Sequence, residues 1–175
     1  MKTKDHFFKA VCTLAIPVAL QSMLQSSFSM VDQIMIGQLG EINVAGVGLA
    51  GKFASIYSVV ISAIGAVAGI MIAQYLGQKN RSEVRRSFFT NLLLGAGIAG
   101  MFMVICTLFP NQIMGAYTRD VQTRQAAAEY LMLVSGTFIP MTGATLLSTL
   151  FRCLEKPRLP LYASILSALL NTGLN

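Results

Sequence analysis

The sequence predicts an all-α membrane protein, a polytopic helical bundle of about five transmembrane helices. Hydrophobic residues make up 54% of the 175-residue chain and charged residues only 11%, whereas soluble domains carry about 25% charged residues. Five segments are apolar and long enough to cross a hydrocarbon core of about 30 Å, which takes about 20 helical residues. Because a helix satisfies its own backbone hydrogen bonds, as lipid requires, we expect membrane lipid to surround the bundle.

Five helical ranges follow from the apolar runs and the polar linkers between them: 11–37, 43–76, 87–109, 127–151 and 159–175. The first range superficially resembles a signal peptide, but it is too long and contains Gln21 and Gln25, so we expect it to be retained. The second is longer than one crossing needs and is expected to tilt or to have an amphipathic start near Lys52. No glycine cap or basic flank closes the fifth range, and we therefore expect a fragment of a longer chain.

Basic residues are divided unevenly between the linkers. If the five crossings hold, ten of the 13 lysines and arginines lie on one side of the membrane, in three groups: Lys2, Lys4 and Lys9; Lys79, Arg81, Arg85 and Arg86; and Arg152, Lys156 and Arg158. Cytoplasmic loops carry such an excess, so we expect a multi-pass protein of the plasma (inner) membrane with a cytoplasmic N-terminus. These loops account for the net charge of +6, and we expect no nucleic-acid partner.

Asp32 is the most informative single residue, because no charge occurs from Val11 to Val31. An ionised carboxylate within a bilayer costs about 2.5–3.5 kcal/mol on insertion scales, which favours a functional role. Ser22, Gln25, Ser29 and Asp32 share one helix face by their spacing of three, four and three. We expect this face to line a wet cavity within the bundle. The alternative is that Asp32 lies at the outer headgroup level, close to the end of the helix.

Three further residues accompany Asp32. Pro17 removes a backbone hydrogen bond inside the first helix and should bend or loosen it there, unless it is simply a tolerated membrane proline. Asn171 and Asn175 are four residues apart and share a helix face. Their amides could join helices or provide neutral oxygen ligands for a hard cation.

Glycine motifs in the second and third ranges have a packing interpretation. Gly46-Val-Gly48-Leu-Ala-Gly51 matches a dinucleotide-binding pattern, but no strand precedes it and no acid follows about 20 residues later. Gly65-xxx-Gly69 and Gly95-xxx-Ala99 fit the small-residue pattern of close helix contacts. The three cysteines form no metal or disulfide pattern, and no nucleophile–base set appears. We therefore expect neither an enzyme nor a bound cofactor.

Taken together, these residues resemble the MATE (multidrug and toxic compound extrusion) family of transporters. The matching segments follow the family's order over nearly the whole chain: Pro17 to Gln21, Phe28 to Gly40 around Asp32, Ala73 to Asn80, Leu150 to Tyr162 through Arg152 and Pro160, and Leu169 to Asn175.

The resemblance implies twelve helices in two six-helix lobes, which are parallel repeats of one plan for secondary transporters. Residues 1–175 would then form a partial N-terminal lobe, an incomplete six-helix unit whose partners are the remaining helices of a full-length transporter. Family members export organic, often cationic, compounds or drugs against an inward flow of protons or sodium, so a small-molecule substrate and a proton or sodium coupling ion are implied.

The resemblance also assigns roles to single residues. Asp32 matches the first-helix acid implicated in cation coupling, Asn171 matches the fifth-helix asparagine near it, and Pro17 matches a proline at which bending has been proposed. Some members have aspartate where this chain has Asn175. Asp32 is then the one certain carboxylate of this half-site, and one carboxylate with neutral oxygens suits either a proton or a sodium ion.

The main hypothesis is therefore a cation-coupled multidrug antiporter. A flippase for lipid-linked saccharides of the same superfamily is an alternative, although such relatives would be expected to carry more basic residues inside the helices, where only Lys52 qualifies. A small, non-transporting membrane protein that acts through helix association is a third interpretation.

Overall fold

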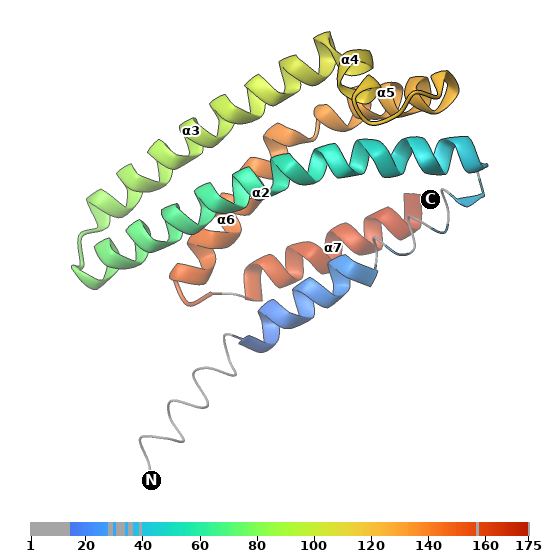
Figure 1. Cartoon of the computed structure of the whole chain (residues 1–175). Helices are drawn as coiled ribbons and strands as arrows, with labels where there is room; N and C mark the ends of the chain where they lie inside the picture. The colour runs from blue at the N-terminus through green and yellow to red at the C-terminus, as the bar shows by residue number, and fades with distance from the viewer. Residues whose placement is uncertain are drawn as a thin grey trace.

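The computed structural model describes residues 15–27, 40–156 and 158–174, with positions 30, 34, 37 and 38, and omits the side chains at 168, 169 and 171–174. All regular structure in these residues is helical, which confirms the predicted fold class (Figure 1). A first helical segment covers residues 15–27. Asp32 and Ser29 of the predicted polar face, and Asn175, lie outside the described residues.

Two long helices, α2 (Glu41–Gly77) and α3 (Arg81–Leu108), run side by side (Figure 1). The 37 residues of α2 extend over about 55 Å at 1.5 Å per residue, well beyond a single hydrocarbon core. Glycine precedes α2 because Gly40 has a φ of 95°, which is in the region that favours glycine. The side chain of Asn80 accepts a hydrogen bond from the Glu83 backbone N–H at 3.3 Å. This cap explains why α3 begins earlier than the predicted residue 87.

The predicted helix over 127–151 is wrong as one continuous element. The structure has two helices, α5 (Val121–Ser135) and α6 (Phe138–Cys153), which meet at a bend of 51°. Pro140 has no backbone N–H to donate to the carbonyl of Gly136, so a regular helix cannot continue through this point. The predicted linker 110–126 also contains a short helix, α4 (Pro110–Gly115), which starts on a proline as first turns tolerate.

The last described helix, α7 (Arg158–Leu174), lies beside the first helical segment (Figure 1). Its bounds agree closely with the predicted 159–175. Of the described helices, α2 and α3 are each long and apolar enough to cross a membrane, and α5 with α6 gives a third span if the bent pair is one crossing. The chain is therefore a membrane-type helical bundle, with fewer demonstrable crossings in its described part than the five expected.

Aromatic side chains form the centre of the core between α2, α3 and α6. Tyr57 is fully buried and stacks on Phe138 with ring centroids 4.2 Å apart. Its hydroxyl donates to the Phe138 backbone carbonyl at 2.8 Å and is hydrogen-bonded to the hydroxyl of Thr142. Because Phe138 is the first residue of α6, Tyr57 fixes the carbonyl directly after the bend to the middle of α2.

Glycines allow α2 to lie close to α5, and α3 to lie close to α6. A Cβ atom on Gly46 would lie 3.0 Å from the backbone nitrogen of Ala127 in α5. A Cβ atom on Gly95 of α3 would lie 2.7 Å from Thr142 Cγ2 in α6, which is closer than real Cβ contacts. The packing interpretation of the glycine-rich segment and of Gly95-xxx-Ala99 is therefore confirmed at these positions.

Candidate functional site

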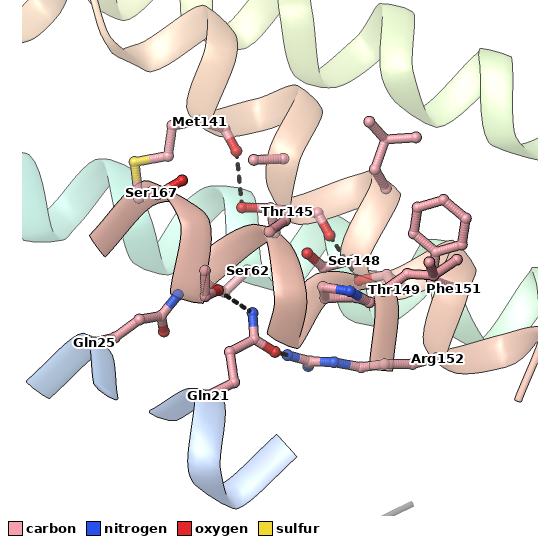
Figure 2. Close-up of a pocket in the computed structure, with 16 residues that line it drawn as sticks. Gln21, Gln25, Ser62, Met141, Thr145, Ser148, Thr149, Phe151, Arg152 and Ser167 are labelled. Carbon is pink, nitrogen blue, oxygen red and sulfur yellow. Dashed lines mark hydrogen bonds between the residues drawn. The ribbon is translucent and has the colours of Figure 1, made fainter. Parts of the chain in front are cut away.

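An open cavity of about 930 Å³ lies between the first helical segment, α6 and α7, with a contribution from α2 (Figure 2). Its polar lining consists of amides, hydroxyls and one guanidinium: Gln21, Gln25, Ser62, Thr145, Ser148, Thr149, Arg152, Ser164 and Ser167. Arg152 is the one charged side chain among the described residues that line it. Such a volume suits a drug-sized molecule, since ligand pockets measure about 300–1,000 Å³.

Gln21 joins three helices at one end of this cavity. Its Nε2 donates to Ser164 Oγ of α7 at 3.2 Å, and its Oε1 accepts from Arg152 Nη2 of α6 at 3.3 Å (Figure 2). The side chain is only 6% exposed, and a buried amide needs such partners. Among the described residues, these are the side-chain hydrogen bonds that tie the first helical segment to the rest of the bundle.

A stripe of polar residues on α6 forms the long wall of the cavity. Thr145, Ser148, Thr149 and Arg152 follow the i, i+3, i+4, i+7 spacing of one helix face. The hydroxyls of Thr145 and Thr149 donate to carbonyls of their own helix, at 2.9 Å to Met141 and at 3.0 Å to Thr145. Their oxygens remain able to accept from a ligand, because a hydroxyl has two lone pairs.

The α6 stripe is placed by its contact with α2. Cβ atoms on Gly65 and Gly69 would lie 3.4 Å from Thr145 Cγ2 and 3.0 Å from Thr149 Cγ2. The thiol of Cys153 also donates to the carbonyl of Gly69 at 3.5 Å. The small residues of Gly65-xxx-Gly69 thus allow α6 to lie directly against α2, which confirms that motif as a helix contact.

The residues predicted from sequence are distributed unevenly relative to this cavity. Gln25 lines it, and Pro17 is buried one turn before Gln21. Ser22 is exposed, does not line the cavity, and donates to the carbonyl of Val18 at 3.0 Å. Asn171 lies in the last turn of α7, and its side chain is not among those described.

Sequence reasoning missed most of the cavity lining. The spacing predicts a polar face that contains Ser22 and Gln25, whereas in the structure Gln21 and Gln25 point toward α6 and α7. The spacing of four residues between Gln21 and Gln25 indicates that they share a helix face. The polar stripe on α6 and the pair Ser164 and Ser167 can be recognised in the sequence in the same way, since each shows a helical period.

The chain matches one known protein family over most of its length. The sequence model of the MatE family matches residues 17–175. This chain belongs to the MatE family. The match includes helices α2 to α7 and, from residue 17 on, the first helical segment.

MatE-family relatives include bacterial proteins described as multidrug resistance proteins. The chain is 28% identical to the "Probable multidrug resistance protein NorM" of Rhizobium meliloti over 137 residues, which cover 78% of this chain and 29% of that protein. It is 25% identical to a protein of the same description from Streptococcus pneumoniae, over 99% of this chain and 39% of that protein. The chain therefore spans well under half the length of these relatives.

Solved transporter structures share the fold. An outward-facing multidrug resistance MATE transporter of the MOP superfamily superposes with a TM-score of 0.86, at 17% identity, over 93% of this chain and 36% of that one. A MOP superfamily transporter from Pyrococcus furiosus, whose structure is described as having a binding pocket of reverse polarity, gives a TM-score of 0.85 over the same shares. At such identity the agreement shows the arrangement of the helices alone.

Proposed function

We propose that this chain is part of a secondary active antiporter that exports organic compounds, coupled to an inward flow of protons or sodium ions. The observation that carries the proposal is the drug-sized cavity between the first helical segment, α6 and α7 of a MatE-family chain. The relatives described as multidrug resistance proteins support an organic, xenobiotic substrate. Membrane integration follows from the family and from the apolar helices α2 and α3.

Asp32 is proposed as the coupling residue, with Asn171 and Asn175 as neutral oxygen partners. Binding of a proton or a sodium ion would neutralise the carboxylate and change the cost of placing it in the membrane. A conformational equilibrium shifts only when the ligand binds its two states with different affinity. The proposed response is a bend at Pro17, which would move the helix that carries Gln21 and Gln25 along the cavity.

The proposed orientation places the N-terminus in the cytoplasm of the inner membrane. Two turns lie toward the same end of the bundle: the α2–α3 turn, next to Lys79 and Arg81, and the α6–α7 turn, next to Arg152 and Lys156 (Figure 1). The connection before α5 lies at the opposite end and has fewer basic residues. This distribution supports the proposal, because cytoplasmic loops carry an excess of lysine and arginine.

Efflux from membrane vesicles that contain the protein tests the proposal. A fluorescent substrate dye is followed under an imposed pH gradient and, separately, under an imposed sodium gradient. We expect Asp32→Asn to abolish the gradient-dependent part of efflux, because the amide cannot be neutralised by either ion. Asp120→Asn is the matched control, since it removes a carboxylate from an exposed loop. Efflux by Asp32→Asn that keeps its rate and its ion dependence would exclude the mechanism.

A further inference from the structure

We propose that the cavity binds an organic molecule through an anionic group held by Arg152, and therefore takes anionic or zwitterionic ligands in preference to purely cationic ones. The inference rests on the proposed function and deepens it, since it names the substrate class of the same cavity. It differs from the expectation that the sequence raised, because the family's substrates are often cationic.

Arg152 has hydrogen-bonding capacity beyond its bond to Gln21. A guanidinium has five N–H donors and stays charged in proteins. Among the described residues, Arg152 uses one nitrogen, Nη2, to donate to Gln21. The ion pair that the described residues form joins Arg86 to Glu83, so Glu155, although near in sequence, forms no direct ion pair with Arg152. Within the described part of the chain, the guanidinium therefore keeps its charge and has donors that no other side chain uses at the edge of the cavity.

Gln21 orients the guanidinium of Arg152. Gln21 is itself fixed by Ser164 of α7, and its Oε1 holds one arm of the guanidinium (Figure 2). A planar guanidinium held in this way is suited to two parallel hydrogen bonds with a carboxylate, sulfonate or phosphate. Lysine in the same place would offer a point charge without this fork.

The remainder of the cavity suits the uncharged body of such a molecule. The wall along α6 runs from Arg152 to Met141, a separation of 11 positions or about 16 Å at 1.5 Å per residue. Between these ends lie the hydroxyls of Ser148 and Thr145 and the apolar side chain of Leu147. A drug-sized ligand can therefore place its acid at Arg152 and its body along the hydroxyl-bearing wall.

The expected effect is moderate, because Arg152 is exposed to solvent. A charge-assisted hydrogen bond contributes more than a neutral one, but water and salt screen an exposed pair. A cation in the same position finds no carboxylate among the described lining residues and is repelled by the guanidinium.

Two dyes with the same xanthene ring system and opposite charge test the proposal directly. The full chain is reconstituted in phosphatidylcholine nanodiscs, and the binding of fluorescein and of tetramethylrhodamine methyl ester is measured by fluorescence anisotropy against empty nanodiscs. We expect fluorescein, the anion, to bind more tightly than the cationic ester. Tighter binding of the cationic ester would overturn the proposal.

Three variants separate Arg152 from the general positive charge of the chain. We expect Arg152→Gln to weaken fluorescein binding about tenfold, the lower end of the effect for charged hydrogen bonds, and Arg152→Lys to weaken it less. Arg158→Gln removes the same charge from an exposed residue that does not line the cavity, and should leave affinity unchanged. Far-UV circular dichroism confirms folding. Equal affinities for all three variants, or equal loss in Arg152→Gln and Arg158→Gln, would overturn the assignment.

A lipid headgroup is the other source of an anionic group. If soluble dihexanoyl phosphatidylglycerol displaces fluorescein at a tenfold lower concentration than the non-fluorescent aromatic carboxylate 2-benzoylbenzoate does, the site belongs to a lipid and the proposal fails. Failure here is distinguishable from failure of the proposed function. If efflux depends on the ion gradient but the anionic dye does not bind more tightly, only the inference about Arg152 is refuted. If the anionic dye binds more tightly but efflux does not depend on an ion gradient, only the proposed antiport is refuted.

Discussion

The contact between Gly95 of α3 and Thr142 of α6 gives a quantitative test of the helix packing. In Gly95→Ala the new methyl group would lie 2.7 Å from Thr142 Cγ2 and 3.2 Å from Ile61 Cδ1. Ile61 can yield, because its Cδ1 is the end of a flexible side chain. Thr142 cannot rotate freely, since its hydroxyl is hydrogen-bonded to the hydroxyl of Tyr57, which itself donates to the Phe138 carbonyl.

Two opposing effects determine the size of the change. Overpacking a close contact costs about 1–3 kcal/mol, whereas replacing glycine by alanine inside a helix gains about 1 kcal/mol. A Cβ atom on Gly97, two residues further along α3, would have no neighbouring atom within 4 Å, so Gly97→Ala shows the gain alone. We expect Gly95→Ala to be less stable than Gly97→Ala by about 1–3 kcal/mol, the overpacking term.

Unfolding in mixed detergent micelles, followed by circular dichroism, measures this difference. At about 2–4 °C per kcal/mol for a chain of this size, it should appear as a lower midpoint temperature for Gly95→Ala than for Gly97→Ala. Thr142→Ser removes Cγ2 and keeps the hydroxyl, so adding Gly95→Ala to Thr142→Ser should cost little. Equal stability of the two alanine variants, or no relief in the double variant, would refute the close approach of α3 and α6.

Two further predictions concern a helix tie and a helix cap. Gln21→Leu should increase amide hydrogen exchange in residues 15–27, because the hydrogen bonds to Ser164 and Arg152 are lost. Ser22→Ala is the control and should leave exchange unchanged. Unchanged exchange in Gln21→Leu would contradict the role of Gln21 in holding the first helical segment to α6 and α7. Hydrogen bonds from the side chain and the backbone N–H of Thr123 lower the pKa of the Asp120 carboxyl group from its ordinary value of 3.8. The ionised carboxylate therefore stabilises the start of α5 fully at pH values above 3.8, and this stabilisation is lost as the pH falls below that value. Below that pH the protection factor at the start of α5, which is the exchange rate of the unfolded peptide at the same pH divided by the observed rate, should therefore fall in the wild type. In Asp120→Asn, which caps without titrating, the protection factor should not change with pH.

Much of the fold could be predicted because hydropathy and length suffice for single helices. The bounds of α2 and α7 lie within two residues of the predicted ranges. The break between α5 and α6 was missed because the apolar run continues through it, although Gly136 and Pro140 mark it. A hydropathy pattern indicates whether a segment lies in lipid or in water. A single proline breaks the helix because it has no backbone N–H, but it leaves the hydropathy of the segment unchanged.

The cavity was less predictable than the helices. Periodicity shows which residues share a helix face, and it indicated a polar face on the first helix and could have indicated another on α6. It does not show the direction in which each face points. The difference between Ser22 and Gln21 is one residue, or about 100° around a helix, and it depends on the positions of α6 and α7. Contacts between distant segments, such as Gln21 with Ser164, are set by this tertiary arrangement.

The bend between α5 and α6 makes α2 a shared template for two separate helices. Helix α5 packs against Gly46 of α2, whereas α6 packs against Gly65. These two glycines are 19 positions apart, so they lie on faces of α2 that are about 100° apart around the helix axis. A one-residue insertion between them would rotate one contact by about 100° against the other. The stretch between Gly46 and Gly65 is therefore fixed in register, and changes in the length of α2 are expected to be tolerated only at its two ends.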